Sequence, residues 1–306
     1  MRKPFFISII CLMAAAFAVA VVSCKKDKEN ELSMPEDNIS EISFDNINGI
    51  HVKVQYDSVS KSDSLNSWLY FQSKSDFELA ISSYCNANDS ILTSFENILA
   101  FPSMRSMLTS DQREAIEIED DLLATFLSPN GTIQIGNYIF RIDVLNDSVL
   151  VFDQSNSYSS GLPQVFSVDD EIFDVLEGNK GSEEKGCTAK NKEKGISIDN
   201  TKVDMKVVYQ KAGIYFSLQS KIKKRTYGGA VELYLSCPTG SSYKRNNDSN
   251  TYLISSNNLS GGNHSYHYRP YSGCKKLVNF HFTVGFLAKT MYENTGWYTL
   301  QIHCGH

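Results

Sequence analysis

The last hundred residues alternate between apolar and polar side chains, a pattern with the period of a β-strand. In the run 278–286, Val278, Phe280, Phe282, Val284 and Phe286 share one face, and the polar residues between them take the other. Seven such runs predict seven strands: 203–210, 213–223, 230–236, 251–255, 265–269, 277–288 and 297–303. Seven short strands with turns between them predict an all-β domain with the architecture of a β-sandwich. Because the cysteine and tryptophan spacing of antibody domains is absent, the topology stays open.

The preceding part of the chain mixes helix and strand patterns and predicts an α+β domain. Residues 51–56 and 68–71 are candidate strands, and three amphipathic helices are expected at about 75–86, at about 91–99 and after Ser110. The first helix has the capping-box spacing from Ser75 to Glu78. An antiparallel meander then follows over 132–152, where Gly136-Asn137 separates two alternating runs and predicts a hairpin turn.

Charge divides the chain in the same way. Residues 24–199 contain 14 Lys and Arg against 31 Asp and Glu, a net charge of −17, whereas residues 200–306 contain 13 against 4, a net charge of +9. A glycine- and charge-rich stretch lies between them. The predicted organisation is therefore an acidic α+β domain at 45–177, a linker at 178–199 and a basic, tyrosine-rich β-sandwich at 200–306.

Two interpretations of this asymmetry remain open. The opposite charges of the two parts could neutralise each other within one molecule, with the tyrosines in a β core and at its rim. The basic part could instead meet an anionic partner such as an acidic glycan, because a field of one sign concentrates ligands of the other. The sequence has no recognisable nucleic-acid-binding motif, and no nucleic-acid partner is expected.

The first 23 residues have the pattern of an export signal. Arg2-Lys3 precedes an apolar run from Phe5 to Val22, and Val21-Val22-Ser23-Cys24 follows. This ending resembles the bacterial lipobox, which implies cleavage before Cys24 and lipidation of its thiol. Several acyl chains would make a stable anchor in the bilayer. The polar residues 24–44 then predict a flexible tether, and the expected location is the outer membrane, facing either the periplasm or the cell surface.

Two further runs resemble a family of uncharacterised lipoproteins from gut Bacteroidota. The first extends from Asp121 to Gly131 and continues into Ile133–Phe140, and the second is Val207–Gln219. The resemblance implies the class of protein and its location, but no activity.

Five cysteines remain after Cys24: residues 85, 187, 237, 274 and 304. An exported protein is expected to contain disulfides, although free buried thiols are the alternative. The four cysteines after residue 186 allow three pairings. Cys237 and Cys274 both lie at predicted strand edges, and this pair is favoured.

The aromatic run Tyr266-His267-Tyr268-Arg269-Pro270-Tyr271, together with Trp297, is the most suggestive group for binding. Exposed rings could stack on sugars while Arg269 binds an acidic group, whereas buried rings would be ordinary cross-strand pairs. The histidines show no zinc spacing, and no metal or cofactor is expected.

Acidic clusters at 119–121 and 169–171 are candidates for the paired carboxylates of a glycoside hydrolase. However, that chemistry needs two carboxylates on opposite sides of a cleft. No catalytic residue is assigned. The expected function is a non-catalytic binding module of the cell envelope for a glycan or protein partner. The alternatives are a structural or accessory lipoprotein and, less favoured, a hydrolase acting on glycans.

Overall fold

The alternating runs pair into three open sheets in the computed structural model, which describes residues 45–56, 67–155, 162–179, 186–187, 191–226 and 230–305. The signal segment, Cys24 and the tether lie outside these residues. Ser43–His306 belong to one compact unit. No helix in the described ranges combines the length and the apolar character needed to cross a membrane.

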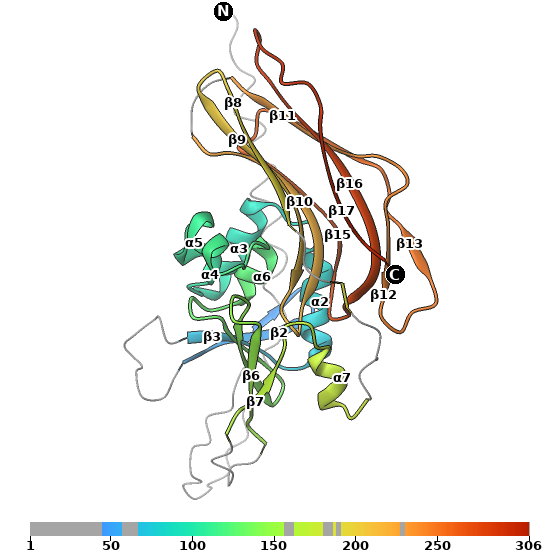
Figure 1. The fold of residues 1–306 in the computed structure, drawn as a ribbon. Coiled ribbons are helices and arrows are strands. Elements are labelled where there is room, and N and C mark those ends of the chain that lie inside the picture. The colour runs from blue at the N-terminus through green and yellow to red at the C-terminus, as the bar shows by residue number, and fades with distance from the viewer. Residues whose placement is uncertain are drawn as a thin grey trace, which may run out of the picture. The chain divides into compact units, whose positions relative to one another are not determined.

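The first sheet has seven strands in sequence order, β1 to β7 (Figure 1). All neighbours are antiparallel except the parallel pair β3–β4, between which the five helices α2 to α6 are inserted. The strands are β1 (Asp45–Ile47), β2 (Ile50–Tyr56), β3 (Ser67–Phe71), β4 (Thr132–Ile135), β5 (Tyr138–Asp143), β6 (Ser148–Asp153) and β7 (Gln164–Phe166). The Gly136-Asn137 hairpin and the meander that follows it are as the sequence predicts.

The helices are α2 (Lys74–Tyr84), α3 (Asp89–Leu99), α4 (Met104–Met107), α5 (Ser110–Ala115), α6 (Asp121–Phe126) and α7 (Ile172–Leu176). The cap of α2 is Ser73, whose hydroxyl accepts from the amide of Asp76, so the predicted cap at Ser75 is wrong. The third predicted helix is also wrong as one element. It divides into α5 and α6 because Glu117 adopts a positive φ of 57°, which ends the first helix.

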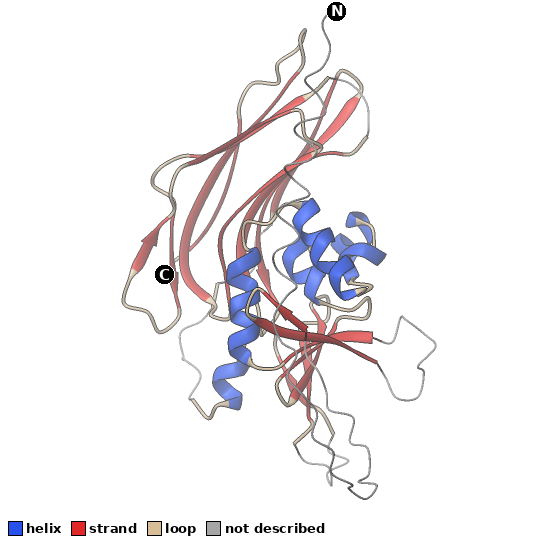
Figure 2. Cartoon of the chain, turned by 180° about the vertical axis from the view of Figure 1, so that it is seen from behind, coloured by secondary structure: helices blue, strands red, loops and turns tan. Residues whose placement is uncertain are grey.

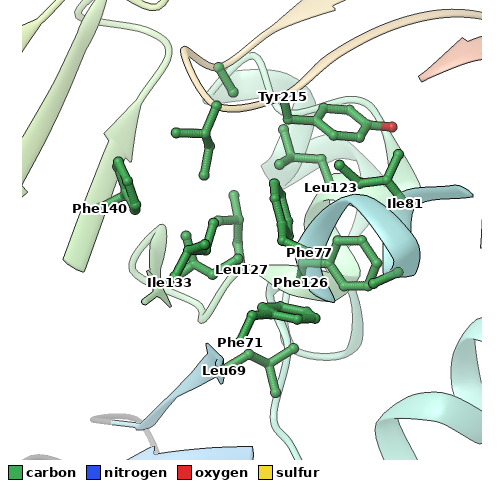
Figure 3. Close-up of a cluster of buried hydrophobic side chains, with 14 of the residues drawn as sticks. Leu69, Phe71, Phe77, Ile81, Leu123, Phe126, Leu127, Ile133, Phe140 and Tyr215 are labelled. Carbon is green, nitrogen blue, oxygen red and sulfur yellow. The ribbon is translucent and has the colours of Figure 1, made fainter. Parts of the chain in front are cut away.

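Helices and the first sheet share one apolar core. Phe71, Phe77 and Phe126 meet in edge-to-face contacts with ring centroids 5.4 to 5.9 Å apart (Figure 3). Tyr215, from the C-terminal part of the chain, is fully buried in the same cluster. This core therefore extends across the predicted domain boundary.

The remaining strands form two sheets with a second core between them. One sheet has the order β15-β10-β9-β8, and the other has β13-β12-β16-β11-β14, with β17 also paired to β16. Figure 2 shows these strands in red from the opposite side of the molecule. The strands are β8 (Lys192–Ile198), β9 (Thr201–Lys211), β10 (Phe216–Lys224), β11 (Glu232–Cys237), β12 (Ser242–Arg245), β13 (Thr251–Leu253), β14 (Asn257–Gly261), β15 (Ser265–Gly273), β16 (Leu277–Lys289) and β17 (Tyr298–Cys304). All seven predicted runs are strands, and β8, β12 and β14 are additional.

Strand β8 corrects the predicted linker at 178–199. Lys192 to Ile198 pair along their whole length with β9, from Lys192 opposite Val207 to Ile198 opposite Thr201. Its side chains are mostly exposed, so no alternating apolar pattern marks it in the sequence.

The predicted disulfide is also wrong. Cys187 is bonded to Cys304, with their Cα atoms 5.6 Å apart, while Cys237 and Cys274 are free and buried. Cys187 donates its backbone amide to Leu277, and Cys304 lies at the end of β17. The bond therefore fastens the segment before β8 to the far sheet.

Candidate functional site

The structure does not gather the predicted binding residues on one exposed surface. Tyr266, Tyr268, Arg269 and Tyr271 lie on β15, and Trp297 lies before β17 at the other sheet. Tyr271 is buried in the second core, and Tyr266 and Tyr268 pack against it. Arg269 faces the opposite way and is only 6% exposed. The role predicted for Arg269, binding an acidic ligand group, is wrong because its guanidinium is already engaged inside the molecule.

The partner of Arg269 is Asp120, in a buried bidentate ion pair. Arg269 Nη2 lies 2.8 Å from Asp120 Oδ1, and Nε lies 3.1 Å from Oδ2. Tyr215 and Ser217 also donate to this carboxylate, and its Oδ1 caps α6 by accepting from the amide of Leu122. Burial opposes the charged form, but Arg269 and these donors outweigh it and lower the pKa of Asp120.

Asp121 forms a second buried ion network beside the first. Arg113 Nη2 lies 2.6 Å from Asp121 Oδ1, and Lys221 Nζ lies 2.9 Å from Oδ2. Although burial raises its pKa, Lys221 and Arg113 hold the pKa of Asp121 well below its usual value. His267 also faces this carboxylate, with Nδ1 3.4 Å from Oδ2.

Further ion pairs join the acidic and basic parts around these two networks. Lys206 lies 2.9 Å from Glu119 and 3.1 Å from Glu114, and Lys275 lies 2.5 Å from Asp174. The first of the two interpretations is confirmed: the opposite charges of the two parts meet within the molecule. The basic side chains on the outer side of the β9–β10 sheet therefore lie against acidic residues of the helical part.

Asp89, Asp121 and His267 have ligand atoms within 4.8 Å of one another, a spacing that could hold a metal ion. However, Asp121 already binds Arg113 and Lys221, and an added cation would meet both positive charges. The cluster is better described as part of the ion network.

His267 predicts a pH dependence of stability. Burial and the nearby charge of Lys221 lower its pKa from 6.5 to about 4, so the folded state keeps the ring neutral. The unfolded chain binds the proton more readily, and stability is therefore lost as pH falls from 6.5 towards 4. Between pH 7 and pH 5 we expect this group to cost on the order of 2 kcal/mol. In urea unfolding, the free energy of unfolding should fall less between pH 7 and pH 5 in His267→Gln than in the wild type. His281→Gln, at an exposed position, should behave as the wild type. An equal fall in the free energy of unfolding in all three proteins would contradict this assignment.

A different surface carries the exposed tryptophan. Trp297 is 57% exposed and lies against Gly285 of β16, where a methyl group would come within 3.2 Å of its Cε3 atom. The loop before it is held by hydroxyls: Thr290 Oγ1 accepts from the amide of Glu293, and Thr295 Oγ1 accepts from that of Ala288. The indole ring of Trp297 therefore packs with one side on the sheet, at the end of a loop that these hydrogen bonds stabilise.

Other residues on this side of the sheet extend the surface. Tyr234 on β11 is opposite Leu287, and Ser236 is opposite Gly285. Leu287 points away from the core, yet is only 7% exposed. We define the outer aromatic face by Tyr234, Gly285, Leu287 and Trp297, with the polar neighbours Ser236, Asn258, Thr283 and Gln301.

The residues that define the outer aromatic face carry no charge, and the charged residues Glu232, which accepts from the Tyr234 hydroxyl at 2.6 Å, and Lys289, which lies opposite Glu232, border one end of it. Its hydrogen-bonding groups are hydroxyls, amides and the imidazole of His281, which lies 3.3 Å from Thr283 and 3.2 Å from Gln301. No Asp, Glu, Lys or Arg occurs at 234–236, 281–287 or 299–301. Trp297 is among the binding residues predicted from the sequence, whereas Tyr234 and Gly285 are not. The signal for Gly285 is present: it interrupts the polar side chains on the outward face of β16.

Comparison with known proteins adds no assignment. No protein-family model matches the chain, and no curated protein matches it either.

Proposed function

We propose that this chain is a lipid-anchored protein of the bacterial outer membrane that acts as a non-catalytic binding module. In this proposal Cys24 carries the lipid, an α+β domain follows the tether, and the strands from β8 onward form a β-sandwich that binds a glycan. The observation that carries the proposal is the exposed Trp297 ring resting on Gly285 among uncharged hydrogen-bonding side chains.

The chemistry of the outer aromatic face favours a neutral glycan. The flat side of a sugar ring is apolar and can lie on an indole, while its hydroxyls exchange hydrogen bonds with side chains at the edge. Ser236, Thr283 and Gln301 supply such groups without charge. Lys289 lies at the end of this face but opposite the carboxylate of Glu232, so the two together offer an acidic glycan no net charge.

The carboxylates first offered for hydrolysis have other partners. Asp120 and Asp121 are held by cations that lower their pKa, whereas a general acid needs a raised pKa. Asp169 pairs with Lys211, and Glu171 accepts from Asn246 and from the amide of Lys276. These contacts support a binding role over a hydrolytic one.

Trp297→Ala tests the proposal. On an array of neutral and acidic oligosaccharides, the wild-type protein should bind neutral ligands, and the variant should lose about five- to tenfold in affinity, because stacking contributes about 1–1.5 kcal/mol. Tyr292→Ala is the matched control, since Tyr292 is 88% exposed on the same hairpin but lies outside the outer aromatic face. A blank array, or equal losses in the two variants, would overturn the proposal.

Gly285→Val provides a second test that keeps the indole. The added side chain must push the ring from its seat, because even one methyl group would lie 3.2 Å from it. We expect weakened glycan binding together with a changed tryptophan fluorescence spectrum. Unchanged glycan binding would mean that the packing of Trp297 on Gly285 has no part in recognition.

The second candidate is a structural or accessory envelope protein. The buried ion networks favour it, because they join the two parts of the chain into one body and leave Arg269 unavailable for a ligand. The same array separates the candidates, since an accessory protein should bind no glycan through Trp297.

A further inference from the structure

A cavity of about 410 Å³ lies between the start of α5 and the outer side of the β9–β10 sheet. Its volume falls in the range of small-molecule sites, about 300–1,000 Å³. Thr109, Ser110 and Glu114 line it from the helix side, and Lys206, Lys221 and Lys223 line it from the sheet. It lies apart from the outer aromatic face, which is on the other sheet.

The carboxylates of this cavity are already matched by cations. Asp111 and Asp204 each pair with Arg225, and Glu114 lies 3.1 Å from Lys206 and 3.7 Å from Arg225. Lys221 is neutralised by Asp121, 2.9 Å away. Each of these charges therefore has an opposite charge in contact.

Lys223 is the exception among the cations that line the cavity. Its Nζ donates to Ser110 Oγ at 2.8 Å, and no carboxylate of the described residues lies within ion-pair distance. Burial and the charge of Lys221 lower the pKa of Lys223. An ammonium group has three protons, so two remain for another acceptor. The hydroxyl proton of Ser110 is also free to be donated to a ligand, because its oxygen serves as the acceptor for Lys223.

We propose that this cavity binds a small oxyanion, a phosphate, sulfate or carboxylate group, between Lys223 Nζ and the Ser110 hydroxyl. The anion supplies the negative charge that Lys223 lacks and draws further attraction from Lys221. Charge-assisted hydrogen bonds of this kind are the strong ones in proteins. The remaining volume leaves room for the molecule that carries the group. This inference is independent of glycan binding at Trp297.

Calorimetric titration of the whole protein with inorganic phosphate, and separately with glucose 6-phosphate, tests the site. We expect saturable binding that weakens about tenfold or more in Lys223→Gln and less in Ser110→Ala. Lys244→Gln is the matched control, because Lys244 lies on β12 of the other sheet. Tighter binding of glucose 6-phosphate assigns the site to a sugar-borne group, and equal binding of the two probes assigns it to the free ion.

The pKa of Lys223, followed by NMR through its side-chain resonances, gives a second measurement besides affinity. Bound phosphate should raise the pKa of Lys223, because the anion stabilises the charged ammonium. Circular dichroism of Lys223→Gln checks that the variant is folded. Absence of phosphate binding, equal affinity in wild type and Lys223→Gln, or an unchanged Lys223 pKa at saturating phosphate would overturn the proposal.

Discussion

Replacing Asp120 with Asn is expected to lower the free energy of unfolding by about 3–5 kcal/mol, because it leaves the Arg269 guanidinium buried without a counter-charge. The carboxylate is fully buried, accepts both guanidinium bonds and caps α6. Urea unfolding measures the loss. Asp111→Asn is the control, since Asp111 forms an exposed pair with Arg225 and should change stability by less than about 1 kcal/mol.

A double-mutant cycle identifies the source of this effect. Arg269→Met alone should also be costly, since Asp120 is then the uncompensated charge, whereas Asp120→Asn combined with Arg269→Met should cost less than the sum of the two. Additive losses, or a loss for Asp120→Asn no larger than that for Asp111→Asn, would mean that the buried pair does not hold the two parts together.

Removing the Cys187–Cys304 disulfide is expected to cost about 2–5 kcal/mol. The bond closes a loop across a sequence separation of 117 residues and restricts the unfolded chain accordingly. Cys187→Ala and Cys304→Ala should lower the melting temperature of the oxidised protein to the same extent. In contrast, Cys85→Ala should have little effect, because Cys85 is free and only partly buried.

Peptide mapping without reduction checks the pairing itself. It should recover Cys187 linked to Cys304 and leave Cys237 and Cys274 open to alkylation after unfolding. A linked Cys237–Cys274 peptide, or a melting temperature unaffected by reductant, would contradict the structure.

The predictions that succeeded depend on local patterns. Alternation identifies a strand when one face is buried, as in β16, and Gly136-Asn137 identifies a tight hairpin. The charge imbalance also led to one interpretation that the ion pairs support, namely that the oppositely charged parts of the chain neutralise each other within one molecule. The division into two domains stays a prediction, although Tyr215 shares a core with residues of the first sheet.

The predictions that failed depend on tertiary contacts. Strand β8 lies at the edge of its sheet and exposes most side chains, so it has the composition of a linker. The pairing of Cys187 follows from the approach of two sheets, which spacing along the chain does not encode. For Arg269, the choice between a ligand and Asp120 depends on which side of β15 faces the helices. Tyr234 and Gly285 become a site with Trp297 only after β11, β16 and β17 pair.

The most direct test of the account is to map where a glycan binds on the whole protein by amide hydrogen exchange, using the ligand that binds best on the array. We expect slowed exchange in β11, in the second half of β16 and at residues 295–301, with little change on raising the salt concentration, because the residues that define the outer aromatic face carry no charge. Slowed exchange confined to Ser265–Gly273, with binding lost at high salt, would contradict it.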